Sequence, residues 1–139
     1  MAHPSQFMSR FVIPKSEYRM ALNLADFRIN FALNPGSTSG PPAVFLYMPD
    51  TIDQQLDKAA RLYLEKASVT RKGSNEIVLT VPRICQWYLD DFGSSEDLVA
   101  KLSPLLKGED RTVVEEALQS NVNVRYSDYS FKCRPLTLI

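Results

Sequence analysis

The chain has 139 residues, of which 45% are hydrophobic and 23% are charged, values typical of a single globular domain. Its 16 basic residues balance 16 acidic ones, so no net charge favours nucleic acid or an anionic membrane surface. No apolar run approaches the roughly 20 residues that a membrane-spanning helix needs. We therefore expect no nucleic-acid partner and no membrane span.

The N-terminus and the cysteines bear on the compartment. Residues 1–6 lack the basic start and the apolar stretch of a secretory signal peptide. Cys85 and Cys133 are too few for a disulfide scaffold. Without a secretion signal, we expect both to be reduced thiols in a cytoplasmic protein.

The N-terminal part of the chain predicts helical pieces followed by two apolar segments. Prolines interrupt residues 1–27, and after Pro14 the stretch 16–25 places apolar side chains at helical spacing. Residues 28–33 predict a short strand or buried segment. Residues 43–48 predict a strand that is apolar on both faces and therefore interior to a sheet.

The loop between these segments, residues 34–42, is rich in Asn, Pro, Gly and Ser. Loops of this kind often carry binding sites. It resembles a phosphate-binding loop only superficially, because no lysine follows Gly40. Pro41 and Pro42 also lack the N–H donors that an anion would need. We expect a tight turn that the Asn34 side chain caps.

The remaining chain predicts a hairpin over 69–81 and helices that pack on the sheet. In the first helix, Thr51 and Gln54 occupy capping-box positions. Ser95, followed by two acidic residues, is expected to start the third. The expected helices are residues 51–68, 82–92, 95–106 and 110–119. The expected sheet strands are residues 28–33, 43–48, 76–81 and 122–131. The fold class is thus α/β mixed (α+β), a single domain with a small sheet packed by about five helices.

Three separated segments, taken in order, resemble one family. The first is Ile29-Asn30-Phe31-Ala32-Leu33-Asn34-x-Gly36-x-x-Ser39-Gly40-Pro41-x-Ala43, followed by Tyr47. The second is Ile52-Asp53-x-x-Leu56-x-x-Ala59-Ala60-Arg61-x-Tyr63-Leu64. The third is Val81-Pro82-Arg83-Ile84-x-x-Trp87-Tyr88-x-Asp90-Asp91-Phe92-Gly93, followed by Ser127-Asp128-Tyr129-Ser130-Phe131. Together they resemble the Domain of Unknown Function 547 family, particularly its eukaryotic branch.

The resemblance implies domain boundaries but no activity, because the family's activity is unsettled. It implies that the chain corresponds to the C-terminal two-thirds of the family domain. Residues 1–27 would then be a helical lead-in to a truncated domain, and 28–139 the family-like α/β domain. A distant link to papain-like or transglutaminase-like folds is also implied. Many members carry His at the position of Asn30 and Cys at those of Pro35 and Gly40, so that chemistry would be absent here.

The candidate binding residues come from the loop and from the third segment. They are Asn34, Ser37, Ser39, Gly40, Trp87, Asp91 and Asp128. Asp90 and Asp91 are neighbours on a helix and cannot converge on one substrate atom, so we expect capping or an ion pair. Asp128 is expected to anchor the C-terminal strand by hydrogen bonds. We name no catalytic residue.

Few histidines and cysteines are available for catalysis or metal binding. His3 is the only histidine, so neither a histidine-pair metal site nor a triad with a second histidine is available. Cys85 lies on an apolar helix and predicts a buried, inert thiol. Lys132 and Arg134 flank Cys133 and would favour its thiolate. We expect no metal and no cofactor.

Loop 34–42 holds no nucleophile and base pair, which favours a non-enzymatic or degenerate interaction or scaffold domain. Its partner would be a protein or a neighbouring domain of a longer chain. One alternative is a papain-like or thiol-dependent hydrolase relative that uses Cys133 or a partner's residues. Another is an incomplete fragment of a larger protein, with Phe31, Phe45 and Trp87 forming an uncovered apolar face.

Overall fold

The computed structural model describes residues 25–73, 76–118 and 122–139. The helix expected over 16–25 and most of the lead-in over 1–27 lie outside these residues. The helices are α2 (Ile29–Ala32), α3 (Ile52–Tyr63), α4 (Ile84–Trp87), α5 (Leu89–Phe92), α6 (Ser95–Leu102) and α7 (Gly108–Ala117). The strands are β1 (Ala43–Val44), β2 (Ser68–Lys72), β3 (Glu76–Val81), β4 (Val122–Tyr126) and β5 (Thr137–Leu138). The mixed α/β class is confirmed.

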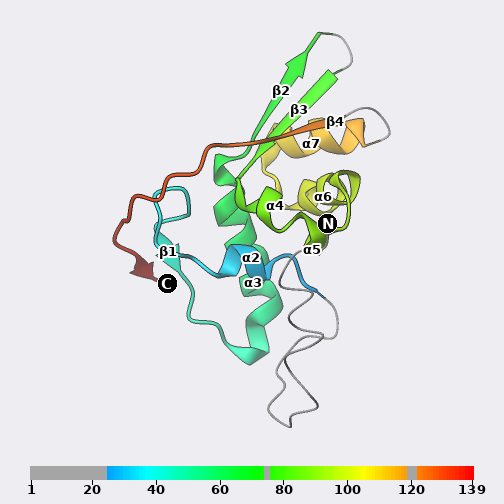
Figure 1. Cartoon of the computed structure of the whole chain (residues 1–139). Coiled ribbons are helices and arrows are strands. Elements are labelled where there is room, and N and C mark those ends of the chain that lie inside the picture. Colours follow the sequence, from blue (N-terminus) through cyan, green and yellow to red (C-terminus); the bar gives the residue numbers. More distant parts are fainter. Residues whose placement is uncertain (1–24, 74–75, 119–121) are drawn as a thin grey trace, which may run out of the picture.

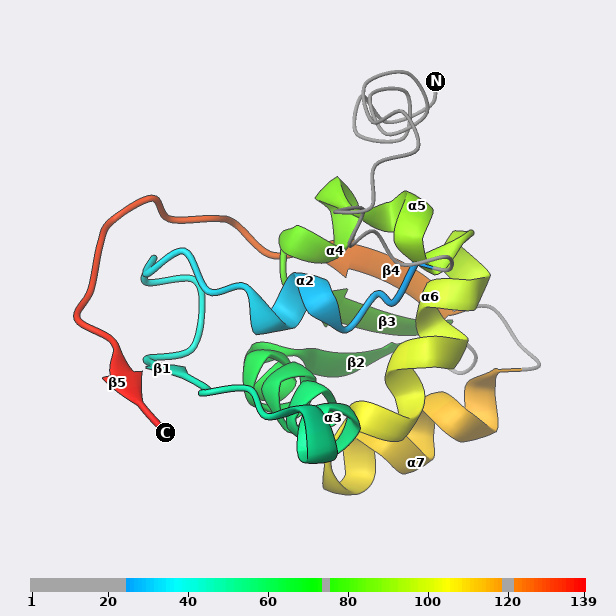
Figure 2. The same cartoon turned by 90° about the horizontal axis from the view of Figure 1, so that it is seen from below.

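The larger sheet has the strand order β2-β3-β4. Strands β2 and β3 form the predicted antiparallel hairpin, whereas β3 and β4 are parallel. A parallel pair needs a long crossover, and here the crossover contains α4 to α7 (Figures 1 and 2). β3 is central and contributes Val78, Leu79 and Val81 to the core. β2 is an edge strand whose exposed Arg71 and Lys72 discourage pairing with another chain.

The expected strand at 28–33 is wrong, because residues 29–32 form the short helix α2. Its first turn is held by Asp26, whose Oδ1 accepts the Arg28 N–H at 3.0 Å. The Arg28 guanidinium also binds Asp53 and Asp57 on α3, at 2.8 and 2.9 Å. The periodicity of a short apolar run does not distinguish a strand from a helix. The ion pairs that hold α2 involve Asp53 and Asp57, which lie outside the run, so the run itself does not reveal them.

The expected interior strand at 43–48 is also wrong. Only Ala43 and Val44 form a strand, and they pair in parallel with β5 at the C-terminus. Leu46 and Met48 are exposed. The Leu46 N–H still donates to Ile139 O at 3.2 Å, whereas the Gln55 side chain binds the Leu46 carbonyl and the Met48 N–H. The structure thus has two sheets where one was expected, and the strand predicted over 122–131 ends at Tyr126.

The helices differ from expectation mainly at their ends. The helix predicted over 51–68 is α3 flanked by two 3-10 turns, and Thr51 makes no side-chain capping bond. The helix predicted over 82–92 is broken at Tyr88 into α4 and α5. The helix α6 begins at Ser95, as predicted, with Ser94 as its N-cap, but it ends at Leu102 and a 3-10 turn follows over Ser103–Leu105.

The main core lies between the β2-β3-β4 sheet and the helices around it. Its buried residues come from α2, α3, β3 and α4 to α7. Aromatic rings join the N-terminal and middle parts: Phe31 lies 5.6 Å from Tyr63 and Phe27 lies 4.9 Å from Phe92 between ring centroids. These contacts bury Phe31. Phe45, which takes no part in them, is half-buried. The continuous uncovered face expected from Phe31, Phe45 and Trp87 is not present.

None of the helices in the part of the chain that the structure describes combines the length and the apolar character needed to cross a membrane.

Candidate functional site

Loop 34–42 is a tight turn organised by one side chain, as predicted. Asn34 Oδ1 accepts the Gly36 N–H at 2.9 Å, and Asn34 Nδ2 donates to the carbonyls of Pro41 and Ala43 at 2.7 and 3.1 Å. Gly36 has a φ of 74°, a conformation that glycine adopts without the strain of a side chain. The Asn34 amide uses its oxygen and its nitrogen to bind the loop backbone, so its role here is to hold the shape of the loop.

The C-terminal segment, residues 127–139, braces this loop from outside (Figures 1 and 2). Thr38 N–H donates to Lys132 O, and Arg134 N–H donates to Gly36 O, each at 2.8 Å. Ser39 Oγ accepts the Ser130 N–H at 2.7 Å. Ser39 therefore binds the chain's own backbone while its hydroxyl hydrogen stays available to donate.

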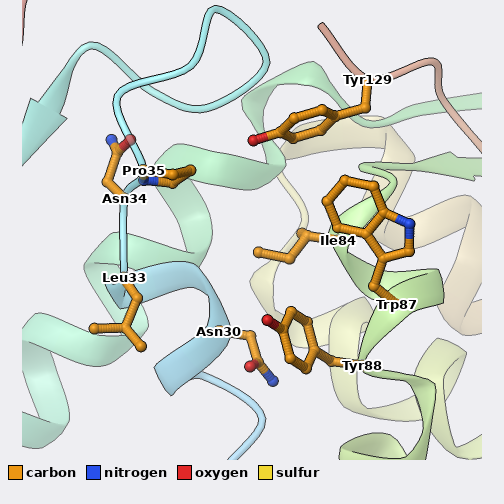
Figure 3. A pocket seen from close by; sticks show the side chains of 8 residues that line it. All are labelled: Asn30, Leu33, Asn34, Pro35, Ile84, Trp87, Tyr88 and Tyr129. Atoms are coloured by element: carbon orange, nitrogen blue, oxygen red, sulfur yellow. The ribbon is translucent and has the colours of Figure 1, made fainter. Parts of the chain in front are cut away.

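A cleft of about 420 Å³ lies between the α2–loop segment and α4. It is lined by Asn30, Leu33, Asn34, Pro35, Ile84, Trp87, Tyr88 and Tyr129. In Figure 3 Leu33, Asn34 and Pro35 lie on one side of the cleft and Ile84, Trp87 and Tyr88 on the other, with Asn30 beside Tyr88. The Tyr129 ring lies beyond Trp87, with its hydroxyl directed toward the loop (Figure 3). The cleft is thus mainly apolar and aromatic.

Three aromatic rings are in mutual contact at one end of this cleft. The Trp87 centroid lies 4.7 Å from Tyr129 and 6.4 Å from Phe131, whose ring is nearly parallel to the indole. Phe131 is 79% exposed and Trp87 is 41% exposed. Trp87 comes from α4 whereas the other two rings come from the C-terminal segment, so the cluster exists only in the folded chain.

The acidic residues considered as candidates, Asp90, Asp91 and Asp128, do not come together at one point of the site. Asp91 Oδ2 accepts a hydrogen bond of 2.8 Å from Asn30 Nδ2, which ties α5 to α2. Asp90 is exposed. Asp128 is exposed and lies 3.5 Å from Arg83, too far for a strong hydrogen bond. The anchoring expected of Asp128 is instead done by Arg83, whose Nε donates to Ser127 O at 2.9 Å.

A second, smaller cavity of about 200 Å³ adjoins the cleft and shares Ile84 and Tyr129 with it. Its lining is more polar and includes Ser39, Lys66 and Arg83. Lys66 and Arg83 were not among the candidate binding residues, because neither stands in a recognisable catalytic or binding motif, although Arg83 belongs to the third family-like segment. Nor were the apolar lining residues Leu33 and Ile84, whose residue types are those of an ordinary core.

The two cysteines lie in different surroundings, and both are free thiols. Cys85 is buried, as predicted, and its burial raises the pKa of the thiol to about 12. Cys133 is exposed beside Ser37, with which its backbone forms an isolated bridge. Neither cysteine lines the cleft. Within the described residues, no cluster of His, Cys, Asp and Glu could hold a metal ion, and His3 lies outside them.

A family model described as a protein of unknown function, DUF547, matches residues 2–64 of the chain. The expected resemblance to this family is confirmed over that stretch. It includes α2, loop 34–42 and α3, whereas α4 and the C-terminal segment lie beyond it. The correspondence to the C-terminal two-thirds of the family domain stays a prediction. No curated protein and no solved structure matches the chain.

Proposed function

We propose that this chain is a protein-interaction module, and that an extended, apolar segment of a partner protein binds in the cleft beside Trp87. The observation that carries the proposal is the cluster of Trp87, Tyr129 and Phe131, of which Trp87 and Phe131 are exposed, at the end of a mainly apolar cleft. Rigid aromatic rings supply much contact area at a low cost in conformational entropy. Aromatic-lined grooves are a recurring way to bind extended peptides.

The same cleft offers little for catalysis. Among the described residues that line it, the side chains are amide, phenol, indole and aliphatic groups, with no thiol, imidazole or carboxylate. Acyl transfer needs a nucleophile within hydrogen-bond reach of a base. The chemistry of this lining therefore favours binding over reaction, in agreement with the interaction domain expected from the sequence.

The chain contains its own reporter for a test. Trp87 is the only tryptophan, so its fluorescence reports a ligand that enters the cleft. Heptapeptides are selected from a random display library against the full chain, and each selected peptide is then titrated while Trp87 emission is followed. We expect apolar peptides that shift this emission in a saturable manner.

Two leucines of nearly equal exposure serve as the matched variants. Leu33 is 68% exposed and lines the cleft, whereas Leu46 is 64% exposed and does not. Leu33→Ala should weaken peptide binding roughly tenfold, because a buried leucine side chain contributes about 1.5–3 kcal/mol. Leu46→Ala should leave the affinity unchanged. Equal effects of the two variants, or no peptide that perturbs Trp87, would contradict the proposal.

A further inference from the structure

The smaller cavity contains an unused hydrogen-bond donor. Tyr63, on α3, lines it, and the Tyr63 side chain is 2% exposed with no hydrogen-bond partner for its hydroxyl. The hydroxyl lies against Gly40, where an added Cβ would stand 3.3 Å from it. A buried hydroxyl without a partner costs free energy. Burial raises the pKa of Tyr63 to about 12, so the group remains a donor at neutral pH.

The charges around this cavity are mainly positive. Among the described residues, Lys66 and Arg83 line it together with a single carboxylate, Asp128, which is fully exposed. Lys66 Nζ donates to the carbonyls of residues 38, 39 and 40 at 2.8, 3.2 and 3.3 Å. It therefore contributes charge rather than a free N–H. Arg134 adds to this field, since it helps to lower the pKa of Lys66, after the larger effect of burial.

Arg83 has N–H groups that are not used in the hydrogen bonds it makes within the chain. Its Nε binds Ser127 O at 2.9 Å and its NH1 binds Gln86 Oε1 at 2.9 Å. The guanidinium carries five N–H donors in all, and its remaining close contact is the 3.5 Å approach to Asp128. With the hydroxyl hydrogens of Tyr63 and Ser39, the cavity offers several donors and a small positive excess.

The cavity is large enough for a small ligand group rather than a single water molecule. A water molecule takes up about 30 Å³ in the liquid, whereas the cavity measures about 200 Å³. A phosphate monoester carries about −1.5 to −2 charges, more than one cation in excess neutralises. A singly charged carboxylate matches the field better. Because Ile84 and Tyr129 line both hollows, one ligand can occupy the two together.

We propose that the polar cavity binds the free C-terminal carboxylate of a partner peptide whose last apolar side chains lie in the adjoining cleft. This inference rests on the proposed function and assigns it a partner class, a protein C-terminus. In this arrangement Tyr63, Arg83 and Ser39 donate to the carboxylate oxygens, and Lys66 supplies positive potential. The exposed aromatic rings hold the preceding residues.

The first experiment compares three small probes on the full chain. N-acetyl-L-leucine carries the carboxylate and an apolar side chain, its amide carries only the side chain, and acetate carries only the carboxylate. Trp87 fluorescence and two-dimensional amide NMR follow each titration at millimolar concentrations. We expect the acid to bind roughly tenfold more tightly than the amide, as suits charge-assisted hydrogen bonds. Acetate should bind more weakly than the acid.

Each other result overturns the inference in a distinguishable way. Equal binding of acid and amide removes the carboxylate site but leaves the peptide cleft standing. Acetate binding as tightly as the acid identifies a small-anion site without a C-terminal peptide. If none of the three probes binds, both the inference and the proposed function are contradicted.

A conservative variant directly tests the Tyr63 hydroxyl, which has no hydrogen-bond partner. Tyr63→Phe should lower the affinity for the acid several-fold, leave that for the amide unchanged, and keep the stability of the fold, since no bond is lost. Tyr47→Phe is the matched control: it removes a hydroxyl that donates to Ala32 O at 3.3 Å outside the cavity. It should not alter acid binding. Unchanged acid binding in Tyr63→Phe would contradict the role of the hydroxyl.

Discussion

Cys85 and Cys133 show how burial decides the chemistry of a residue. Cys85 belongs to the core cluster, and its burial disfavours the thiolate, which raises the pKa of the thiol to about 12. Cys133 is exposed, and its sequence neighbours Lys132 and Arg134 are cations. Only Cys133 is accessible to a reagent in the folded chain. The thiol-dependent alternative therefore depends on Cys133 alone.

We expect iodoacetamide at neutral pH to modify Cys133 at the rate of an ordinary exposed thiol. Cys85 should react only in denaturant, because its thiolate is scarce and its sulfur inaccessible. Peptide mass spectrometry after timed quenching measures both rates, with a short unstructured cysteine peptide as the reference. Alkylation of Cys133 much faster than the reference would favour the thiol-enzyme alternative over an interaction module.

At the scale of elements, helix starts depend on side-chain geometry that sequence position alone does not reveal. Ser94 and Asp97 form a capping box at the start of α6: Ser94 Oγ accepts the Asp97 N–H at 3.1 Å, and Asp97 Oδ2 accepts the Ser94 N–H at 3.0 Å. Thr51 occupies the equivalent position before α3 without such a bond. The α3 helix is held instead by its tertiary contacts, including the Arg28 ion pairs.

Ser94→Ala should therefore lower the free energy of unfolding by about 1 kcal/mol, the usual cost of a lost N-cap. Thr51→Ala, the matched change at an N-cap without a side-chain bond, should alter it by much less. Urea denaturation followed by circular dichroism measures both values. Equal losses in the two variants would show that the capping box contributes nothing to stability.

The whole molecule is held together by a core shared among distant elements. Leu79, on the central strand β3, is completely buried in the cluster to which α2, α3 and α4 to α7 also contribute. The described elements thus bury their apolar faces against one another. Such a shared core predicts cooperative unfolding of the isolated chain. The fragment alternative predicts a shallow loss of signal instead.

We expect a single urea transition with a slope of roughly 1–3 kcal/mol/M. Leu79→Ala should lower the free energy of unfolding by about 2–5 kcal/mol, since it removes buried methylenes and leaves a cavity. Leu118→Ala, the same change at an exposed position beyond the end of α7, should have little effect. A broad, non-cooperative transition in the unchanged chain would favour the fragment alternative.

Much of the fold could be read from local pattern. The helical spacing over 51–68, the hairpin over 69–81 and the helix over 110–119 all appear in the structure, with shifted ends. The Asn34 turn was predicted for the same reason: its bonds join residues within one loop. Interactions between near neighbours in sequence follow from spacing and residue type, so the sequence by itself determines them.

The candidate site depends on contacts that no local pattern contains. Residues 30–35, α4 and the C-terminal segment are far apart in sequence, yet they enclose one cleft. The strand expected at 28–33 is wrong because distant Asp53 and Asp57 bind Arg28 and residues 29–32 are helical. The strand expected at 43–48 is reduced to the two residues that pair with the distant β5, while Gln55 binds the backbone at Leu46 and Met48. Sequence alone thus determined the fold class and most helices, since those follow from periodicity. Only tertiary packing decided the cleft, the exposure of Trp87 and the burial of Tyr63, because each depends on which distant segments come into contact.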